Sequence, residues 1–212
     1  FMRMFKGFWA SEGMEDTVYS EADLLKGQAR ESVRFDSPPT KVAALDPAFT
    51  QGGDRSVACF GNFGYVDKAP VLEFDGYEIL AEDIYDKETP RSAQIAQRFK
   101  AACQKRGVLP ENAATDSTGA GGPFHDVVSM EWSDRVLPVN FAGKASDKPV
   151  AATDRTPGCD RYANRATEIW YGGVELLRSQ PLRGDDNDVA REMGGRKNET
   201  PAGGTQRAAP QA

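Results

Sequence analysis

The sequence predicts an α/β protein built on a mixed five-stranded sheet flanked by helices. Two observations predict this class. Three short strand-like runs come first, and two later strands alternate with segments of helical periodicity before a last helical segment. At 212 residues, 39% of them hydrophobic, the chain is long enough for one domain of ordinary size.

Composition divides the chain into three parts. Residues 1–36 mix aromatic and charged residues with weak periodicity, and we expect a linker arm there. Residues 37–193 carry the predicted strands and helices and form the main domain. Residues 194–212 are rich in Gly, Pro, Ala and Gln, which is typical of a flexible tail.

The first three strands lie close together in the sequence, which favours an antiparallel meander. Residues 41–45 form a short apolar run that stops at Asp46. Residues 56–65 and 77–85 are predicted as the second and third strands, the third because it partly alternates apolar and polar residues.

A helix is predicted between Pro90 and Gly107. Pro90 suits a first turn and Gly107 a helix end. Apolar residues between them fall at i, i+1, i+4, i+7 and i+8 and make one stripe: Ile95, Ala96, Phe99, Ala102 and Cys103.

The remaining elements alternate. A fourth strand over residues 111–115 ends at Asp116, and a fifth over residues 135–141 contains Pro138, which indicates a sheet edge. Between them a glycine-rich turn, residues 117–122, leads into a helix with an inner face of Phe124, Val127 and Val128. A third helix is expected from Asp160, as N-cap, to about residue 178, burying Tyr162, Ala166, Ile169 and Trp170.

Charge and composition exclude several classes of protein. With 26 basic and 32 acidic residues the net charge is −6, which argues against a basic nucleic-acid coat protein. A DNA enzyme needs only a local basic rim. The one histidine nearly excludes a His-rich zinc site, so metal chemistry must rest on carboxylates, which suit magnesium or manganese. No phosphate-binding GxxxxGK[ST] motif and no apolar run of about 18 residues occurs, so neither ATP hydrolysis nor a membrane span is expected.

Asp46 and Asp116 are the main candidates for chemistry. Each follows a predicted strand, at the junction where open α/β sheets place their sites. If the strands are neighbours, the two carboxylates face each other and favour a divalent cation. Two such cations would support hydrolysis of a phosphodiester. The alternative is that the two residues form an Asx-turn and a helix cap.

Further candidates have weaker patterns. Asp54 follows two glycines and is either a turn residue or an outer metal contact. His125 is either structural or, if it faces the site, a metal ligand or general base. Asp126 is an expected first-turn acid that favours the helix dipole, or an outer contact to metal. The glycine-rich turn, residues 117–122, either brings its backbone amides close to a bound phosphate at a helix N-terminus or is a tight turn that binds no ligand.

The third helix and the segment after it hold the last candidates. Arg161, Arg165 and Glu168 would lie at i, i+4 and i+7 of one helix. The two arginines would bind DNA phosphates, or Arg165 and Glu168 would form an ordinary i,i+3 ion pair. Any of three clustered acids could supply a further carboxylate, although such a cluster is more often a solvated turn: Asp185, Asp186 and Asp188.

Several segments in a set order carry a family resemblance. They are RMFKGFW (3–9) with TVY (17–19), ALDPA (44–48) with GGD (52–54), DSTGAGG (116–122) with Asp126, and VNF (139–141) with YANRATEIW (162–170). In these segments the chain resembles the nuclease domain of the large terminase subunit of tailed bacteriophages, the motor protein that packages viral DNA. The resemblance spans about residues 1–193.

The resemblance implies a ribonuclease H-like fold and metal-dependent endonuclease activity that cuts concatemeric double-stranded DNA. Asp46 and Asp116 would be the catalytic, metal-binding residues, with Mg²⁺ or Mn²⁺ as cofactor. The implied partners are double-stranded DNA, the portal, the small terminase subunit and an ATPase domain that precedes the nuclease. No membrane is involved, and the host cytoplasm is the expected location. Because a phosphate-binding loop is missing, we expect this chain to be a C-terminal piece.

One departure from the family pattern matters. The family's third metal-binding aspartate lies in a Ser-Pro-Asp-x-x-Asp-Ala stretch, and no such stretch occurs here. Either the chain is cut short or Asp185, Asp186 or Asp188 substitutes. The alternative function is therefore a catalytically degenerate packaging-motor module that binds DNA or portal without cleaving. A third interpretation is a junction resolvase or transposase-like nuclease, against which the N-terminal arm argues.

Overall fold

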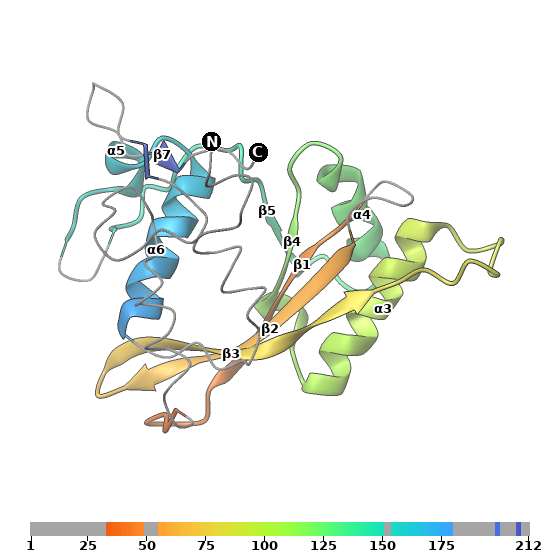
Figure 1. The fold of residues 1–212 in the computed structure, drawn as a ribbon, viewed down its shortest axis with the longest axis horizontal. Helices are drawn as coiled ribbons and strands as arrows, with labels where there is room; N and C mark the ends of the chain where they lie inside the picture. The colour runs from red at the N-terminus through yellow and green to blue at the C-terminus, as the bar shows by residue number, and fades with distance from the viewer. Residues whose placement is uncertain (1–32, 49–54, 151–153, 180–197, 200–206, 209–212) are drawn as a thin grey trace, which may run out of the picture. The chain divides into compact units, whose positions relative to one another are not determined.

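A mixed five-stranded sheet organises the chain, with strand order β3-β2-β1-β4-β5 (Figure 1). The computed structural model describes residues 33–48, 55–150, 154–179, 198–199 and 207–208. The strands are β1 (Thr40–Asp46), β2 (Ser56–Val66), β3 (Ala69–Leu80), β4 (Ala113–Asp116) and β5 (Leu137–Val139). The first three pair antiparallel, whereas β1 with β4 and β4 with β5 are parallel. The predicted fold class and the predicted meander are both confirmed.

The β2–β3 hairpin is closed by a tight turn at Asp67 and Lys68. Both residues have positive φ, 50° and 67°, as a two-residue hairpin turn requires. The Asp36 carboxylate accepts both turn amides, from Asp67 to Oδ1 and from Lys68 to Oδ2, at 3.2 Å each. The segment before β1 therefore ties down the far end of this hairpin.

The predicted third strand was misplaced. β3 begins at Ala69 and ends at Leu80, rather than running over residues 77–85. Pro70 and Gly76 indicate a break in the sequence, but β3 is the edge strand of the sheet, where a missing amide donor is tolerated. Beyond Leu80 the chain folds around Gln94, whose Oε1 accepts the Asp83 amide at 2.7 Å.

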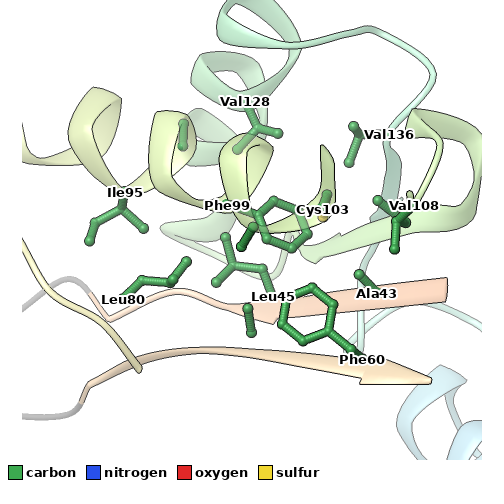
Figure 2. Packing of buried hydrophobic residues seen from close by; sticks show 14 of the residues in the cluster. Ala43, Leu45, Phe60, Leu80, Ile95, Phe99, Cys103, Val108, Val128 and Val136 are labelled. Carbon is green, nitrogen blue, oxygen red and sulfur yellow. The ribbon is translucent and has the colours of Figure 1, made fainter. Parts of the chain in front are cut away.

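Two helices, α3 (Arg91–Arg106) and α4 (Gly121–Glu131), cover one face of this sheet (Figure 1). The predicted stripe of α3 is buried, and Gly107, with φ of 73°, ends the helix as expected. Figure 2 shows Phe99 packed between the helices and the strand residues Leu45 and Phe60. The core of the protein therefore lies between the α3/α4 layer and this face of the sheet.

The later strands are shorter than predicted. A 3₁₀ turn, η1 (Pro110–Asn112), precedes β4, so only Ala113–Asp116 is strand. Only Leu137–Val139 of the predicted fifth strand pairs with β4, and it lies at the sheet edge as Pro138 indicated. The brevity of both strands means that few ladder hydrogen bonds hold them.

Arg34–Phe141 forms one compact unit, and the described residues from Ala142 onward belong to a second. The second unit contains a one-turn helix α5 (Gly158–Arg161), the longer α6 (Arg165–Ser179) and a small antiparallel pair, β6 (Asn198–Glu199) with β7 (Arg207–Ala208). Residues 1–32 of the predicted linker arm and most of the predicted tail lie outside the described residues. Among the helices described, none is long and apolar enough to cross a membrane.

The predicted third helix is in fact two helices, because Asn164 interrupts it. Asn164 Oδ1 accepts both the amide and the hydroxyl of Thr167 at 2.9 Å, which makes Asn164 the N-cap of α6. Asp160 lies inside α5 and is not the cap. Tyr162 is buried as expected, but Ile169 is 42% exposed and was wrongly assigned to the buried face.

Candidate functional site

Asp46 and Asp116 end two strands that lie side by side. The parallel register of β1 and β4 pairs Ala43 with Ala113, Ala44 with Ala114, and Leu45 with Thr115. The next residue along both strands is the aspartate. Since adjacent parallel strands end at the same sheet edge, the two carboxylate-bearing residues are neighbours, which is the condition on which the predicted site depends.

The two carboxylates also leave the sheet on the same face. Side chains alternate between the faces of a strand. Leu45 and Thr115, which precede the aspartates, are 2% and 1% exposed on the face that α3 and α4 cover. Asp46 is exposed and Asp116 half-buried, so both point to the opposite face.

A local turn orients the Asp116 carboxylate. Its Oδ1 accepts the Thr118 amide at 2.7 Å, which is the geometry of an Asx-turn. The Thr118 hydroxyl in turn accepts the Phe141 amide at 2.9 Å, and the Ser117 amide donates to the Val139 carbonyl at 2.9 Å. The turn that fixes Asp116 is thereby tied to the end of β5, and the Asx-turn interpretation is compatible with a site at this position.

The glycine-rich segment is a tight turn that starts α4 against the end of β4. The amides of Gly121 and Gly122 donate to the carbonyls of Thr118 and Gly119 at 2.9 and 3.3 Å. A Cβ on Gly121 would lie 2.4 Å from the Asp116 carbonyl oxygen, so only glycine fits there. Because the turn uses these amides internally, its geometry favours the tight-turn interpretation over a phosphate cradle.

Of the other acidic candidates, only Asp126 lies among the described residues. Asp126 is exposed in the second turn of α4, so its assignment to the first turn was wrong; that turn carries no acid. Asp54 lies outside the described residues, as do Asp185, Asp186 and Asp188. In the part of the chain that the structure describes, no group of three or more His, Cys, Asp or Glu could hold a metal ion. The third acid therefore stays a prediction.

His125 lies on the helix-covered side of β4. Its Nδ1 is 2.8 Å from the hydroxyl of Thr115, and its Nε2 is 3.4 Å from the hydroxyl of Ser129, one turn along α4. Thr115 points away from the face on which the carboxylates emerge. The histidine is thus placed behind the candidate site and not in it.

The candidate DNA-binding arginines are both ion-paired and belong to different helices, which corrects their assignment to one helix. Arg161, in α5, contacts Asp154 Oδ2 at 2.8 Å, and its side chain is 43% exposed. Arg165 begins α6 and contacts Glu168 Oε2 at 2.7 Å, the i,i+3 pair considered from the sequence. A role of Arg161 and Arg165 in DNA binding stays a prediction.

Glu168 has a structural role that its spacing alone did not reveal. Besides Arg165, its carboxylate accepts the amide of Ser146 at 2.9 Å and the Ser146 hydroxyl. The Arg165 amide donates to the Gly143 carbonyl at 2.8 Å. The N-terminal turn of α6 therefore holds the segment that starts at residue 143.

The chemistry of the Asp46–Asp116 pair fits a hard divalent cation. Carboxylate oxygens are the ligands that Mg²⁺ and Mn²⁺ prefer. Asp116 Oδ1 is oriented by the Thr118 amide, and its Oδ2 accepts no hydrogen bond from the residues described. The pair therefore offers a fixed carboxylate next to an exposed one on a single face.

No family model and no curated protein matches this chain. Among solved structures, the large terminase nuclease from the thermophilic phage G20c with bound magnesium is similar to it. The likeness has a TM-score of 0.52 and covers 93% of this chain and 89% of the other at 14% identity. The fold of this chain is that of a large terminase nuclease.

The terminase nuclease fold agrees with the resemblance found in the sequence. A ribonuclease H-like fold was expected, and the mixed sheet with its parallel β1–β4–β5 half and flanking helices has that form. Thr118 and Gly121, which orient and contact Asp116, both lie in the glycine-rich segment DSTGAGG that the sequence predicts as a turn. What the sequence lacked was the contact between that turn and the Asp116 backbone.

Proposed function

We propose that this chain is the metal-dependent endonuclease domain of a viral DNA-packaging terminase. The observation that carries the proposal is the adjacent placement of Asp46 and Asp116 on one face of the sheet, at the ends of parallel strands. The similar solved structure is a terminase nuclease with bound magnesium, which supports the same activity here. The substrate would be concatemeric double-stranded DNA.

Asp46 and Asp116 would hold Mg²⁺ or Mn²⁺. Two neighbouring carboxylates repel each other, and a cation between them relieves that repulsion. When bound, a pair of such cations supplies a hydroxide nucleophile at neutral pH and stabilises charge on the phosphorus and the leaving oxygen. Asp116 contributes an oriented oxygen, because the Thr118 amide fixes the rotation of its carboxylate. Asp46 contributes the more exposed carboxylate of the two.

The two candidate arginines would contact DNA phosphates. Arg161 is the better candidate for a phosphate contact, because its exposed ion pair with Asp154 exchanges readily with solvent. Arg165 is held by Glu168, which also binds Ser146. In the host cytoplasm the domain would work with the portal, the small terminase subunit and an ATPase domain.

Plasmid cleavage tests the proposal. The purified chain is incubated with supercoiled plasmid and Mn²⁺, Mg²⁺ or EDTA, beside Asp46→Asn and Asp116→Asn, which keep the side-chain shape but remove the charge. We expect metal-dependent nicking and linearisation, reduced by at least about a hundredfold in either variant. Asp126→Asn is the matched control, because that exposed acid lies on α4, the helix layer on the other face of the sheet.

Cleavage that persists in Asp46→Asn would overturn the assignment of the site. DNA binding by a folded wild-type chain without any cleavage would instead support the degenerate packaging-motor module. Loss of activity in Asp126→Asn alone would move the site to the helix-covered face. A preference for branched over linear DNA would favour a junction-resolving nuclease.

A further inference from the structure

We propose that His125 is a positioning residue that holds Asp116 in place from the opposite face of the sheet. The inference rests on the proposed function, because it assigns His125 a part in the metal affinity of the Asp46–Asp116 pair. It concerns a residue whose sequence context left a structural and a catalytic interpretation open. The geometry on both sides of β4 decides between them.

The imidazole joins α4 to β4 through Nδ1, whereas Nε2 lies near a side chain of α4 itself. On one side, Nδ1 shares a hydrogen bond of 2.8 Å with the hydroxyl of Thr115, which is 1% exposed. On the other, Nε2 is 3.4 Å from the hydroxyl of Ser129 in the same helix. A buried hydroxyl without such a partner would be costly, so this contact fixes the Thr115 side chain.

Thr115 and Asp116 are consecutive residues that point to opposite faces of β4. Fixing the Thr115 side chain therefore fixes the rotation of the strand at the peptide before Asp116. β4 has four residues and pairs with β1 and β5 over only three positions each, so the ladder alone leaves its end weakly held. The hydrogen bond from His125 therefore restrains the end of β4, where a longer strand would be held by more ladder hydrogen bonds.

The first residue of α4 connects the position of this helix to the position of Asp116. Gly121 approaches the Asp116 carbonyl so closely that no side chain fits between them. A small shift of α4 toward the sheet would therefore push directly on Asp116. His125, one turn into α4, sets that distance through Thr115.

A catalytic role for His125 does not fit this geometry. A general base or ligand must reach the reacting atoms, whereas His125 contacts the side of Thr115 that faces the helix layer. The carboxylates of Asp46 and Asp116 emerge on the other face. His125 therefore acts through Thr115 and Asp116.

Mn²⁺ affinity of the full chain tests the proposal without turnover. The dissociation constant is measured by electron paramagnetic resonance of free Mn²⁺, on wild type, His125→Leu, His125→Asn and Thr115→Val, with the melting temperature of each. We expect His125→Leu and Thr115→Val each to weaken binding about tenfold, the lower end of what outer-shell partners contribute. His125→Asn places a polar atom where Nδ1 lies, so its affinity should stay within about twofold of wild type.

Two controls separate positioning from general loss of stability. Ile95→Ala leaves a cavity at a buried site on α3 rather than α4, so it should lower the melting temperature and leave Mn²⁺ affinity unchanged. The double variant His125→Leu, Thr115→Val should bind Mn²⁺ no worse than either single variant, because both remove one contact.

Each result has a distinct meaning. If wild type binds no Mn²⁺, or binds it equally after Asp46→Asn and Asp116→Asn, the proposed function fails. If binding depends on the carboxylates but Thr115→Val and His125→Leu keep wild-type affinity, only the positioning role is overturned. Equal weakening in Ile95→Ala would also overturn it. Should His125→Leu not fold, Thr115→Val and His125→Asn give the answer by themselves.

Discussion

Gly121 and Asp116 are in direct backbone contact: a Cβ on Gly121 would lie 2.4 Å from the Asp116 carbonyl oxygen and 2.9 Å from its carbonyl carbon. Helix α4 therefore begins against the last residue of β4. The contact explains why a glycine stands at the first position of α4, where the helix carries no side-chain cap. It also couples the start of the helix to the candidate metal site.

Gly121→Ala should destabilise the protein by about 1–3 kcal/mol, the usual cost of overpacking, because backbone and not a flexible side chain must move. Chemical denaturation followed by circular dichroism measures the change. Gly122→Ala is the matched control: its Cβ would meet only the Ser117 carbonyl oxygen at 3.8 Å, an ordinary contact. We expect it to be neutral or slightly stabilising. Equal effects of the two substitutions would contradict the close contact.

Glu168→Ala should release the segment that begins at residue 143. The substitution removes the acceptor of the Ser146 amide and hydroxyl and leaves Arg165 without its partner, a loss of about 1–3 kcal/mol. Amide hydrogen exchange of Ser146, measured by nuclear magnetic resonance, should speed up accordingly. Glu168→Gln keeps an oxygen acceptor for Ser146, so it should lower the free energy of unfolding by less than Glu168→Ala does.

Glu111→Gln provides the comparison for Glu168. It removes an ion pair with Arg135 whose N–O distance is 3.8 Å and whose side chains are 46% and 71% exposed. Such a pair contributes little, so the change should stay within about 0.5 kcal/mol. Unchanged Ser146 exchange in Glu168→Ala would refute the anchoring role.

Cys103 should be the least reactive of the three cysteines in the native protein. Burial raises the pKa of the Cys103 thiol to about 12, so almost no thiolate forms at pH 8. Cys59 and Cys159 are only half-buried. A brief pulse of iodoacetamide followed by peptide mass spectrometry should label these two first, while all three react alike in denaturant. Rapid labelling of native Cys103 would show that its site opens.

Asp86 should titrate below the usual aspartate range. The amide and hydroxyl of Thr89, with the amide of Glu88, lower the pKa of this carboxyl below its ordinary 3.8. The charged form is favoured in the folded state, so its stabilising effect is present above the unfolded pKa and disappears as the pH falls through the folded pKa. Carboxyl carbon resonances followed from pH 5 to 2 test this. A midpoint at or above 3.8 would contradict it.

Acidification should also loosen the loop that Asp86 organises. Its Oδ1 accepts the Glu88 and Thr89 amides at 3.0 Å each. The protection of these two amides, taken relative to the intrinsic exchange rate at each pH, should fall below the folded pKa of Asp86, and Asp86→Asn should remove that pH dependence. A loss of protection that persists unchanged in the variant would assign the effect to another group.

Local patterns were sufficient wherever a single element decided the outcome. The stripe on α3 and its end at Gly107 follow from helical periodicity and from the backbone freedom of glycine. β1 was predicted because an apolar run of that length, stopped by Asp46-Pro47, fits a buried strand. In both cases the determining interactions lie within a few residues of each other.

Predictions failed where a distant partner or a single side chain overrode the pattern. Residues 81–85 continue an alternating pattern, but Gln94 and Asp86 draw them into a loop. The helical pattern between Asp160 and residue 178 is continuous, yet Asn164 caps a new helix within it. Neither hydrogen bond has a periodic signature.

By itself, the sequence determined that two strands end in aspartate and that a glycine-rich turn follows the second. It could not determine that these strands pair, because 69 positions separate Asp46 from Asp116 and strand pairing depends on side chains from the whole sheet. The tertiary structure decided that β1 and β4 are parallel neighbours, that both carboxylates leave one face, and that His125 supports Thr115 from the other. The physical reason is that α3 and α4 gain most from burying the apolar face of the sheet, and the opposite face is where charge can remain in water.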